Sequence, residues 1–173
     1  MGFLTWLNRA PAKPLIILSN REPFEHHRSP DSSLSVAAPA GGLTSALQPV
    51  LEATGGTWIA WGSGSADFEV TDAGDTVAVP PERPSYRLRR LRLSANEVAG
   101  YYLETANRAL WPICHSQLNR FVYDDADWQV YRQVNERFAA AAIAEARGLS
   151  ATCWIQDYHL ALVPGILRRV RHL

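Results

Sequence analysis

The sequence predicts an α/β fold, with a Rossmann-like parallel sheet flanked by helices. Two short apolar runs, Leu15–Leu18 and Cys153–Ile155, each stop abruptly at polar residues. Between them lie segments with the apolar spacing of helices, so strands and helices alternate along the chain. That order favours parallel strands joined by right-handed crossovers. We therefore expect one sheet with the polar residues that follow its strands gathered at its carboxyl edge.

Length and composition narrow the class of protein. The chain has 173 residues, of which 47% are hydrophobic, which suits a single globular domain with a real core. Lys plus Arg and Asp plus Glu number 17 each, so no basic excess indicates a nucleic-acid partner. The apolar runs are too short for a signal peptide or a membrane span. We expect a leader segment over residues 1–14, a domain over residues 15–173 and a cytoplasmic protein.

The cysteines and histidines do not suggest a metal site. Cys114 and Cys153 lie among apolar neighbours, which predicts buried thiols in a reducing cytoplasm rather than a disulfide or zinc framework. His26 and His27 are adjacent and lack a carboxylate at a ligand spacing. We expect both histidines to be exposed to solvent and no metal to bind.

The first strand, Leu15–Leu18, leads into the polar run Ser19–Arg21. If the sheet is parallel, Arg21 lies at the ligand-binding edge. A guanidinium suits phosphate because its planar fork donates two parallel hydrogen bonds and stays charged. The alternative is a surface arginine that pairs with Glu22 or Glu25.

Residues 22–40, rich in Pro, Ser and charge, are predicted to form a long loop. The loop ends at Gly41 and Gly42, before a helix whose apolar face includes Leu47 and Leu51. Glycines before a helix let a phosphate approach the free N–H groups, and the helix dipole favours the anion. A plain turn explains the glycine pair equally well. We expect Pro49 to break or kink this helix.

The middle of the chain reads as strands. Residues 57–61 alternate as a strand does, with one tryptophan expected in the core. A hairpin turn is predicted at residues 72–75, between strands at 68–70 and 77–79. Tyr86–Leu93 alternates leucine with arginine, which predicts a strand whose arginines form a solvated face.

Two helices follow. Ser94 and Glu97 form a capping box, so a helix is expected to start there, pass the G-Y-Y run and end at Trp111 and Pro112. A second long helix is cued by Asp127 and stopped by Gly148. This helix is expected to be mainly structural.

The last strand is followed by Gln156, Asp157, Tyr158 and His159, and then by helical apolar spacing. An acid, a phenol and an imidazole at the carboxyl end of a parallel strand are placed to face a bound molecule. The alternative is that Asp157 merely caps the next helix, as Asp commonly does. The turn by itself favours the cap.

Six motifs occur in one order: S-N-R, G-G-L, W-x-x-W-G, G-Y-Y, L-W-P and W-I-Q-D-Y-H-L. Together they resemble the amino-terminal half of the trehalose-6-phosphate synthases, retaining glycosyltransferases of the GT-B fold. The resemblance covers Leu15 to Leu173. The runs S-N-R-E-P-F and G-S-G-S-A-D-F-E-V are similar to those of a bacterial subgroup.

The resemblance implies roles for the residues that match the acceptor site. Arg21 and Tyr102 would bind the phosphate of glucose 6-phosphate, and Asp157 would accept hydrogen bonds from the acceptor's hydroxyls. Trp61 and Trp111 would form walls of the sugar site, because apolar sugar faces stack on aromatic rings.

The resemblance also implies a donor and a reaction. Gly41 and Gly42 would lie against UDP-glucose or another nucleotide-glucose. Glucose would pass to glucose 6-phosphate with retention of configuration, giving trehalose 6-phosphate. Basic residues of a carboxyl-terminal domain and a helix amino terminus would neutralise the leaving diphosphate, without a metal or other cofactor. Asp157 would position the acceptor rather than attack.

The resemblance further implies that the carboxyl-terminal, donor-binding domain is absent from these 173 residues, so we expect a truncated amino-terminal domain without turnover of its own. Two alternatives stay open. One is the same chemistry on glycerol 3-phosphate, as in a glucosylglycerol-phosphate synthase, and the other is a non-catalytic sugar-phosphate-binding module. We expect small-molecule partners, no nucleic acid, no membrane and, at full length, room for a homo-oligomer.

Overall fold

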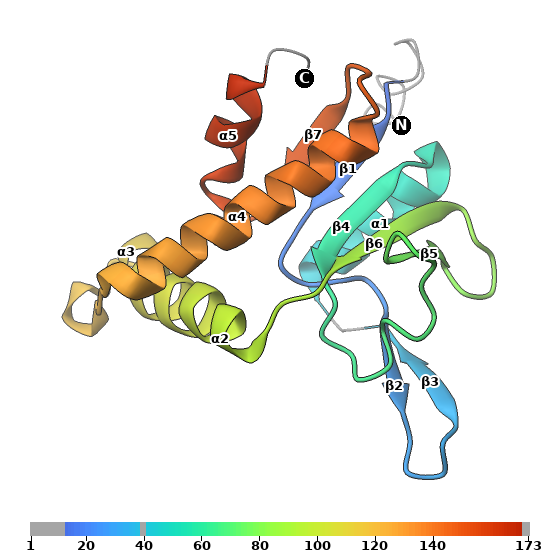
Figure 1. The fold of residues 1–173 in the computed structure, drawn as a ribbon, viewed down its shortest axis with the longest axis horizontal. Helices are drawn as coiled ribbons and strands as arrows, with labels where there is room; N and C mark the ends of the chain where they lie inside the picture. The colour runs from blue at the N-terminus through green and yellow to red at the C-terminus, as the bar shows by residue number, and fades with distance from the viewer. Residues whose placement is uncertain (1–12, 39–40, 171–173) are drawn as a thin grey trace.

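The computed structural model describes residues 13–38 and 41–170 (Figure 1). Its main sheet has the strand order β5-β6-β4-β1-β7. Four strands run parallel, namely β1 (Leu15–Leu18), β4 (Thr57–Trp61), β6 (Tyr86–Leu91) and β7 (Thr152–Ile155). The fifth, β5 (Thr76–Val79), pairs antiparallel with β6 at the edge. The predicted α/β fold is therefore confirmed, with one antiparallel strand added to the expected parallel sheet.

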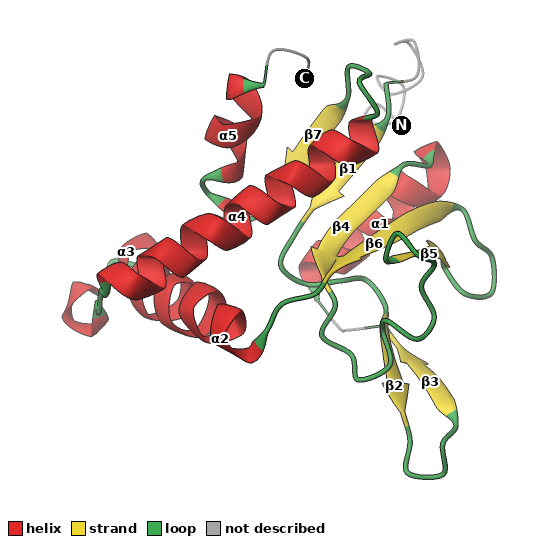
Figure 2. Ribbon diagram, viewed as in Figure 1, coloured by secondary structure: helices red, strands yellow, loops and turns green. Residues whose placement is uncertain are grey.

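Helices cover both faces of this sheet (Figure 2). One face carries α1 (Gly42–Thr54). The other carries η1 (Val98–Leu110), α4 (Asp125–Ala146) and α5 (Val163–Arg169). Short helical turns complete the chain, namely α2 (Ala95–Glu97), α3 (Trp111–Cys114), η2 (Leu118–Arg120) and η3 (Tyr158–Leu160).

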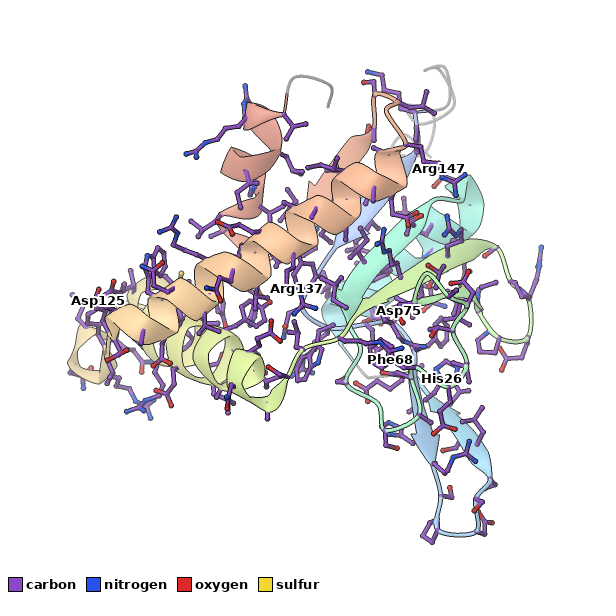
Figure 3. The ribbon with its side chains drawn as sticks, viewed as in Figure 1. His26, Phe68, Asp75, Asp125, Arg137 and Arg147 are labelled. Atoms are coloured by element: carbon purple, nitrogen blue, oxygen red, sulfur yellow. The ribbon has the colours of Figure 1, made fainter. Side chains whose placement is uncertain are left out.

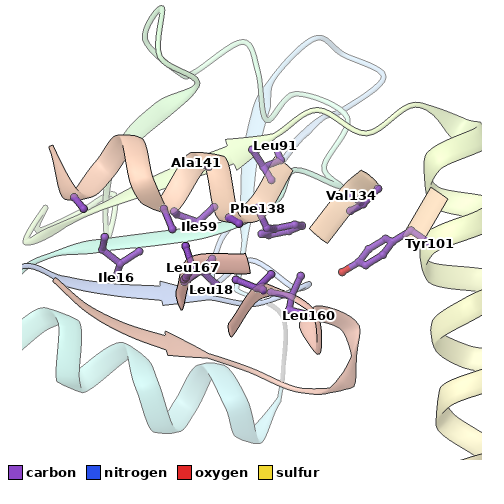
Figure 4. Close-up of a cluster of buried hydrophobic side chains, with 14 of the residues drawn as sticks. Ile16, Leu18, Ile59, Leu91, Tyr101, Val134, Phe138, Ala141, Leu160 and Leu167 are labelled. Atoms are coloured by element: carbon purple, nitrogen blue, oxygen red, sulfur yellow. The ribbon is translucent and has the colours of Figure 1, made fainter. Parts of the chain in front are cut away.

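Two apolar cores lie on the two faces of the sheet, because successive strand residues point to opposite sides. Ile16 and Leu18 face α4, where Phe138 is fully buried (Figure 4). Ile17 and Trp58 face α1 on the other side. Trp58 is thus the tryptophan expected in the core, whereas Trp61 at the end of β4 is half-buried.

The first helix matches its prediction except at the proline. Helix α1 runs through Pro49 to Thr54, so of the two outcomes expected at Pro49, a break or a kink, the break is wrong. It ends where expected, at Gly55, whose positive φ of 71° suits glycine.

The described part of the predicted long loop, residues 22–38, is not irregular throughout. It contains an antiparallel hairpin of β2 (Glu25–Arg28) and β3 (Leu34–Ala37), which projects from the body of the molecule (Figure 1). His26 lies at the base of this hairpin (Figure 3) and is only 4% exposed, so its predicted exposure is wrong. The backbone N–H of His26 donates to Asp67 Oδ1 at 2.7 Å, which explains why the residue is drawn inward.

The prediction of a hairpin around residues 72–75 is also wrong. Residues 68–70 form no strand, and β5 pairs with β6 instead. Asp72 closes the turn itself, because its Oδ1 accepts from the backbone N–H of Gly74 at 2.8 Å and of Thr76 at 3.0 Å.

The capping box is confirmed, but the helix after it differs from the prediction. Ser94 N–H donates to the Glu97 carboxylate at 2.8 Å, and Glu97 N–H donates to Ser94 Oγ at 3.2 Å. Helix η1 is a π-helix of 13 residues and leads directly into α3. The predicted stop at Trp111 and Pro112 is wrong, because helical structure continues through both residues to Cys114, with Pro112 in the first turn of α3.

The long helix α4 starts slightly earlier than its cue. Asp124 caps it by accepting from the N–H groups of Ala126 and Asp127. The chain leaves the helix through Arg147 in the left-handed region and Gly148, as the sequence indicates. Glu145 near its end is held by Arg87 and Arg89 of β6, both at 3.1 Å.

Several expectations concern exposure. Cys114 is exposed and Cys153 only half-buried, so the prediction of two buried thiols is wrong. Trp154 is 37% exposed because β7 is an edge strand among the described residues.

No helix in the described ranges is long and apolar enough to cross a membrane. The predicted boundary between a leader segment and the domain, at residues 14 and 15, stays a prediction, because residues 1–12 lie outside the described part of the chain. Pro14 O accepts a hydrogen bond from Thr152 N–H at 2.9 Å.

Candidate functional site

The carboxyl ends of three parallel strands meet at one edge of the sheet. Ser19 N–H, after β1, donates to Ile59 O of β4 at 3.1 Å. Trp61 N–H donates to Asn20 O at 3.3 Å, and Gln156 N–H, after β7, donates to Leu18 O at 2.9 Å. These bonds place the residues that follow β1, β4 and β7 side by side, as a parallel sheet requires.

A row of aromatic rings lies at this edge. The ring of Tyr102 on η1 is 6.1 Å from that of Trp61 and 5.6 Å from that of His159, between centroids. His159 in turn stacks on Tyr158 at 4.3 Å. We call Trp61, Tyr102, His159 and Tyr158 the ring row. All four side chains are half-buried, so their rings are held in place and still reach solvent.

The two tyrosines of the G-Y-Y motif have different surroundings. Tyr101 is fully buried in the core on the α4 side of the sheet (Figure 4), and its ring stacks on that of Tyr131 of α4, at 5.9 Å between centroids. Tyr102 belongs to the ring row. Gly100 before them allows η1 to approach α4, because a Cβ there would come within 2.9 Å of the Val130 Cβ. Tyr101 therefore lies in the core, and Tyr102 lies at the carboxyl edge of the sheet.

Opposite charges accompany the ring row. Arg21 is exposed directly after β1, and the Asp157 side chain is 54% exposed after β7. Asp157 Oδ2 lies 3.7 Å from Nδ1 of His159. Burial lowers the pKa of His159; the Asp157 carboxylate opposes this shift and the Arg21 guanidinium adds to it. The imidazole is therefore neutral at pH 7, and the charge at this edge belongs to Arg21 and Asp157.

Asp157 also caps the short helix η3, as expected if its role is only that of a helix cap. Its Oδ1 accepts from Tyr158 N–H at 2.8 Å. The backbone at Asp157 has φ 69° and ψ 167°, a region that glycine enters readily and other residues rarely do. Capping does not require this conformation, since an N-cap residue ordinarily has extended, negative φ.

The structure does not bring Trp111 into the ring row. Trp111 lies in α3, and its ring stacks on that of exposed His115 at 4.1 Å. Within residues 13–38 and 41–170, no ring contact joins it to Trp61, Tyr102 or His159.

Gly41 and Gly42 form the amino terminus of α1. Both are exposed, and a Cβ built on either would meet no atom of the described residues within 4 Å. Gly41 has an extended φ of 179°, so its conformation does not require glycine. As far as residues 13–38 and 41–170 show, the pair leaves open space in front of the free N–H groups of a 13-residue helix.

Sequence reasoning missed a cluster of buried charges behind Arg21. Arg90 of β6 is fully buried, and its Nε donates to Glu22 Oε2 at 2.7 Å. Its Nη2 contacts both Asp67 Oδ1 at 3.1 Å and His26 Nδ1 at 2.8 Å. The prediction that all the arginines of this strand are solvated is wrong for Arg90. The alternation of arginine with leucine does not predict this cluster, because Glu22 and Asp67 lie 68 and 23 residues from Arg90 in the sequence.

This cluster links two parts of the edge. Glu22 Oε1 accepts from Ser63 N–H, in the turn after Trp61, at 2.9 Å. Burial raises the pKa of Glu22 to about 8, and its hydrogen bond with Asp67 adds to the shift. Burial alone would raise the pKa of Asp67 too, but the bonds from Glu22 and from His26 N–H lower it overall. Of the two carboxyls, Glu22 is therefore the one whose protonated form the fold favours.

Among the described residues, no three His, Cys, Asp or Glu side chains are grouped so as to hold a metal ion.

Comparison with known proteins agrees with this geometry. The model of glycosyltransferase family 20 matches residues 13–172. A trehalose-6-phosphate synthase of Mycobacterium avium is 39% identical over 157 residues, which are 90% of this chain and 30% of that protein. The chain thus spans about 30% of the length of the curated relatives it matches.

Solved structures are similar over the same region. A trehalose-phosphate synthase of Burkholderia xenovorans in complex with glucose-6-phosphate is 28% identical, with a TM-score of 0.65, over 92% of this chain and 31% of its own. A structure from E. coli bound with UDP-2-fluoro glucose is 28% identical, with a TM-score of 0.66, over 90% of this chain and 30% of its own. These likenesses confirm the fold of a GT-B amino-terminal part. By sequence and by fold, the chain belongs to glycosyltransferase family 20.

Proposed function

We propose that this chain forms the acceptor side of a trehalose-6-phosphate synthase. The enzyme would transfer glucose from UDP-glucose to glucose 6-phosphate, with retention of configuration, and release trehalose 6-phosphate. The observation that carries the proposal is the ring row with Arg21 and Asp157 at the same sheet edge. The similar structures that contain glucose-6-phosphate and a UDP-glucose analogue support it.

Each group at the edge suits one part of a phosphorylated hexose. Arg21 is exposed and can give its planar fork to a phosphate. The rings of Trp61 and Tyr102 offer apolar faces to a pyranose, and the Tyr102 hydroxyl can donate to the phosphate. Asp157 has two carboxylate oxygens that accept from sugar hydroxyls. Trp111 would join the site only as an outer wall, because its ring lies against His115.

The donor side of the proposal rests on α1. The amino terminus of this helix, at Gly41 and Gly42, presents free N–H groups and open space to an anion. A nucleotide diphosphate fits that chemistry. We further propose that the reaction needs no metal, and that Asp157 orients the acceptor rather than forming a covalent bond. Orientation of two bound sugars can supply about 7 kcal/mol or more of the rate enhancement.

The ring row favours a hexose phosphate over glycerol 3-phosphate. A three-carbon acceptor has no ring face to cover Trp61 and Tyr102, and these half-buried rings would then face water. The same row argues for a sugar rather than a phosphate alone as the ligand of a non-catalytic binding module.

A transfer assay with competing acceptors tests the proposal. The natural gene product that contains this chain would be given UDP-glucose with equimolar glucose 6-phosphate and glycerol 3-phosphate. We expect trehalose 6-phosphate as the main product. Glucosylglycerol phosphate as the main product would overturn the acceptor assignment, and tight acceptor binding without any transfer would favour the binding module.

A further inference from the structure

The turn after β7 is strained at one residue. Asp157 has φ 69° and ψ 167°, a backbone conformation that places a Cβ in steric conflict and that glycine alone adopts freely. Such a conformation persists only where the surrounding structure enforces it. Something in the fold must therefore hold residues 157–162 in place.

Two side chains of α4 contact the backbone of this turn. The Tyr131 hydroxyl donates to Tyr158 O at 2.6 Å and accepts from Ala161 N–H at 3.1 Å. One helical turn later, the Asn135 amide donates to His159 O at 3.2 Å, and its oxygen accepts from Leu162 N–H at 3.2 Å. Together they satisfy backbone groups of four residues within five positions.

Both side chains are themselves fixed. Tyr131 and Asn135 are fully buried, and the Asn135 amide also donates to Tyr131 O at 2.9 Å. The Tyr131 ring stacks between Trp128, at 5.2 Å, and Tyr101, at 5.9 Å. A buried amide or hydroxyl left without partners is costly, so the two side chains hold the turn firmly.

We propose that Tyr131 and Asn135 are positioning residues that hold Asp157 in its strained conformation, with its carboxylate at the sheet edge beside the ring row. The carboxylate is then pre-oriented for an acceptor hydroxyl, instead of relaxing toward an ordinary extended cap. Neither side chain touches the acceptor. The inference rests on the proposed function for its purpose, but its structural part can be tested without any ligand.

A double-mutant cycle tests the structural part. Asp157→Gly removes the strain, and Tyr131→Phe removes two of the four bonds to the turn. Urea unfolding of this chain gives the folding equilibrium constant of each variant. We expect Asp157→Gly to raise that constant roughly tenfold in the wild-type background, after allowing for the entropy of glycine in the unfolded chain. In the Tyr131→Phe background the gain shrinks below about threefold, because the turn has already relaxed.

Arg147 supplies a matched control, since it also has a positive φ, of 51°, but lies outside the turn. Arg147→Gly should change the folding constant by the same factor in both backgrounds. An equal gain from Asp157→Gly in both backgrounds would overturn the proposal, and so would a loss in the wild-type background. If Tyr131→Phe does not fold, Asn135→Ala replaces it in the cycle under the same criteria.

Binding measurements test the purpose of the turn. Calorimetric titration with glucose 6-phosphate should show that Tyr131→Phe weakens binding roughly tenfold. Val50→Ala, on the opposite face of the sheet, should lower stability without changing that affinity. Unchanged affinity in Tyr131→Phe would overturn the positioning role. A wild-type chain that binds no glucose 6-phosphate would count against the proposed function, while the unfolding cycle would still decide whether the turn is held under strain.

Discussion

The two turns that bring Arg21 and Asp157 to the sheet edge are held in contrasting ways. The turn after β1 is anchored by the buried guanidinium of Arg90, which pairs with the Asp67 carboxylate and donates to Glu22. The turn after β7 is anchored by the neutral side chains of Tyr131 and Asn135. Arg21 in the first turn is not among the described residues with positive φ, whereas Asp157 in the second has a φ of 69°.

This difference shows that one site can combine a turn held by buried ionisable groups with a turn held by neutral hydrogen bonds. Buried charges hold firmly while all partners are present, but their balance depends on protonation. The neutral pair is insensitive to pH, because burial raises the pKa of Tyr131 to about 12 and an amide does not titrate. We therefore expect the stability of the turn that carries Arg21, which would bind the phosphate, to depend on pH. The stability of the turn that carries Asp157, which would bind sugar hydroxyls, should depend instead on the backbone strain at Asp157.

The largest effect is expected from Arg90→Ala. This change leaves Glu22 and Asp67 buried beside each other without their cation, and breaking a buried pair in this way costs about 3–5 kcal/mol. Urea unfolding measures it. Arg92→Ala is the control, because Arg92 pairs with Asp75 at the surface and should cost only about 1 kcal/mol. Equal losses in the two variants would contradict the charge anchor.

A pH-dependent effect is expected from Glu22→Gln. Unfolded Glu22 loses its proton near pKa 4.5, but in the folded chain it keeps the proton to a pKa of about 8. Between these values the folded chain binds one more proton, so raising the pH removes stability, by at most about 1.4 kcal/mol per pH unit. Glutamine has no such proton to lose.

The free energy of unfolding of Glu22→Gln should therefore rise relative to wild type as the pH increases from 5 to 8. Comparing the two proteins at each pH removes most of the contribution of His26, whose pKa is lowered by burial. Glu82→Gln, at an exposed position, should follow the wild-type curve throughout. A constant difference between Glu22→Gln and wild type would show that Glu22 is not protonated in the fold.

The contrast also shows what the sequence could predict. Apolar runs located β1, β4, β6 and β7, and the carboxyl-edge rule then placed Arg21 and Asp157 on the same side. The capping box located the helix that starts after Ser94, and Asp127 indicated α4, whose cap is Asp124. These features depend on neighbours within a few positions, which a sequence displays directly.

The anchors of both turns escaped prediction because they join residues far apart in the chain. Arg90 looked like one of four arginines on a strand, and only the fold gives it Glu22 as a partner 68 residues away. Asn135 sits in a helix whose apolar spacing gave no hint of a turn 27 residues later. The π-helical form of η1 has no composition signal either.

The most direct test of the sugar-phosphate site is a calorimetric titration with glucose 6-phosphate and with glucose. Wild type, Arg21→Ala and Asp157→Asn would be compared with Arg132→Ala, an exposed arginine on α4 whose side chain contacts Gln129 at 3.3 Å. We predict that Arg21→Ala weakens binding of glucose 6-phosphate about 10- to 100-fold, through lost charged hydrogen bonds, and leaves binding of glucose unchanged.

Asp157→Asn keeps a capping oxygen, so it should weaken binding of both ligands while changing the free energy of unfolding by only about 0.5 kcal/mol. Arg132→Ala should match wild type. If Arg21→Ala instead binds glucose 6-phosphate as tightly as Arg132→Ala does, the phosphate does not bind at the carboxyl end of β1 and the account of this site is wrong.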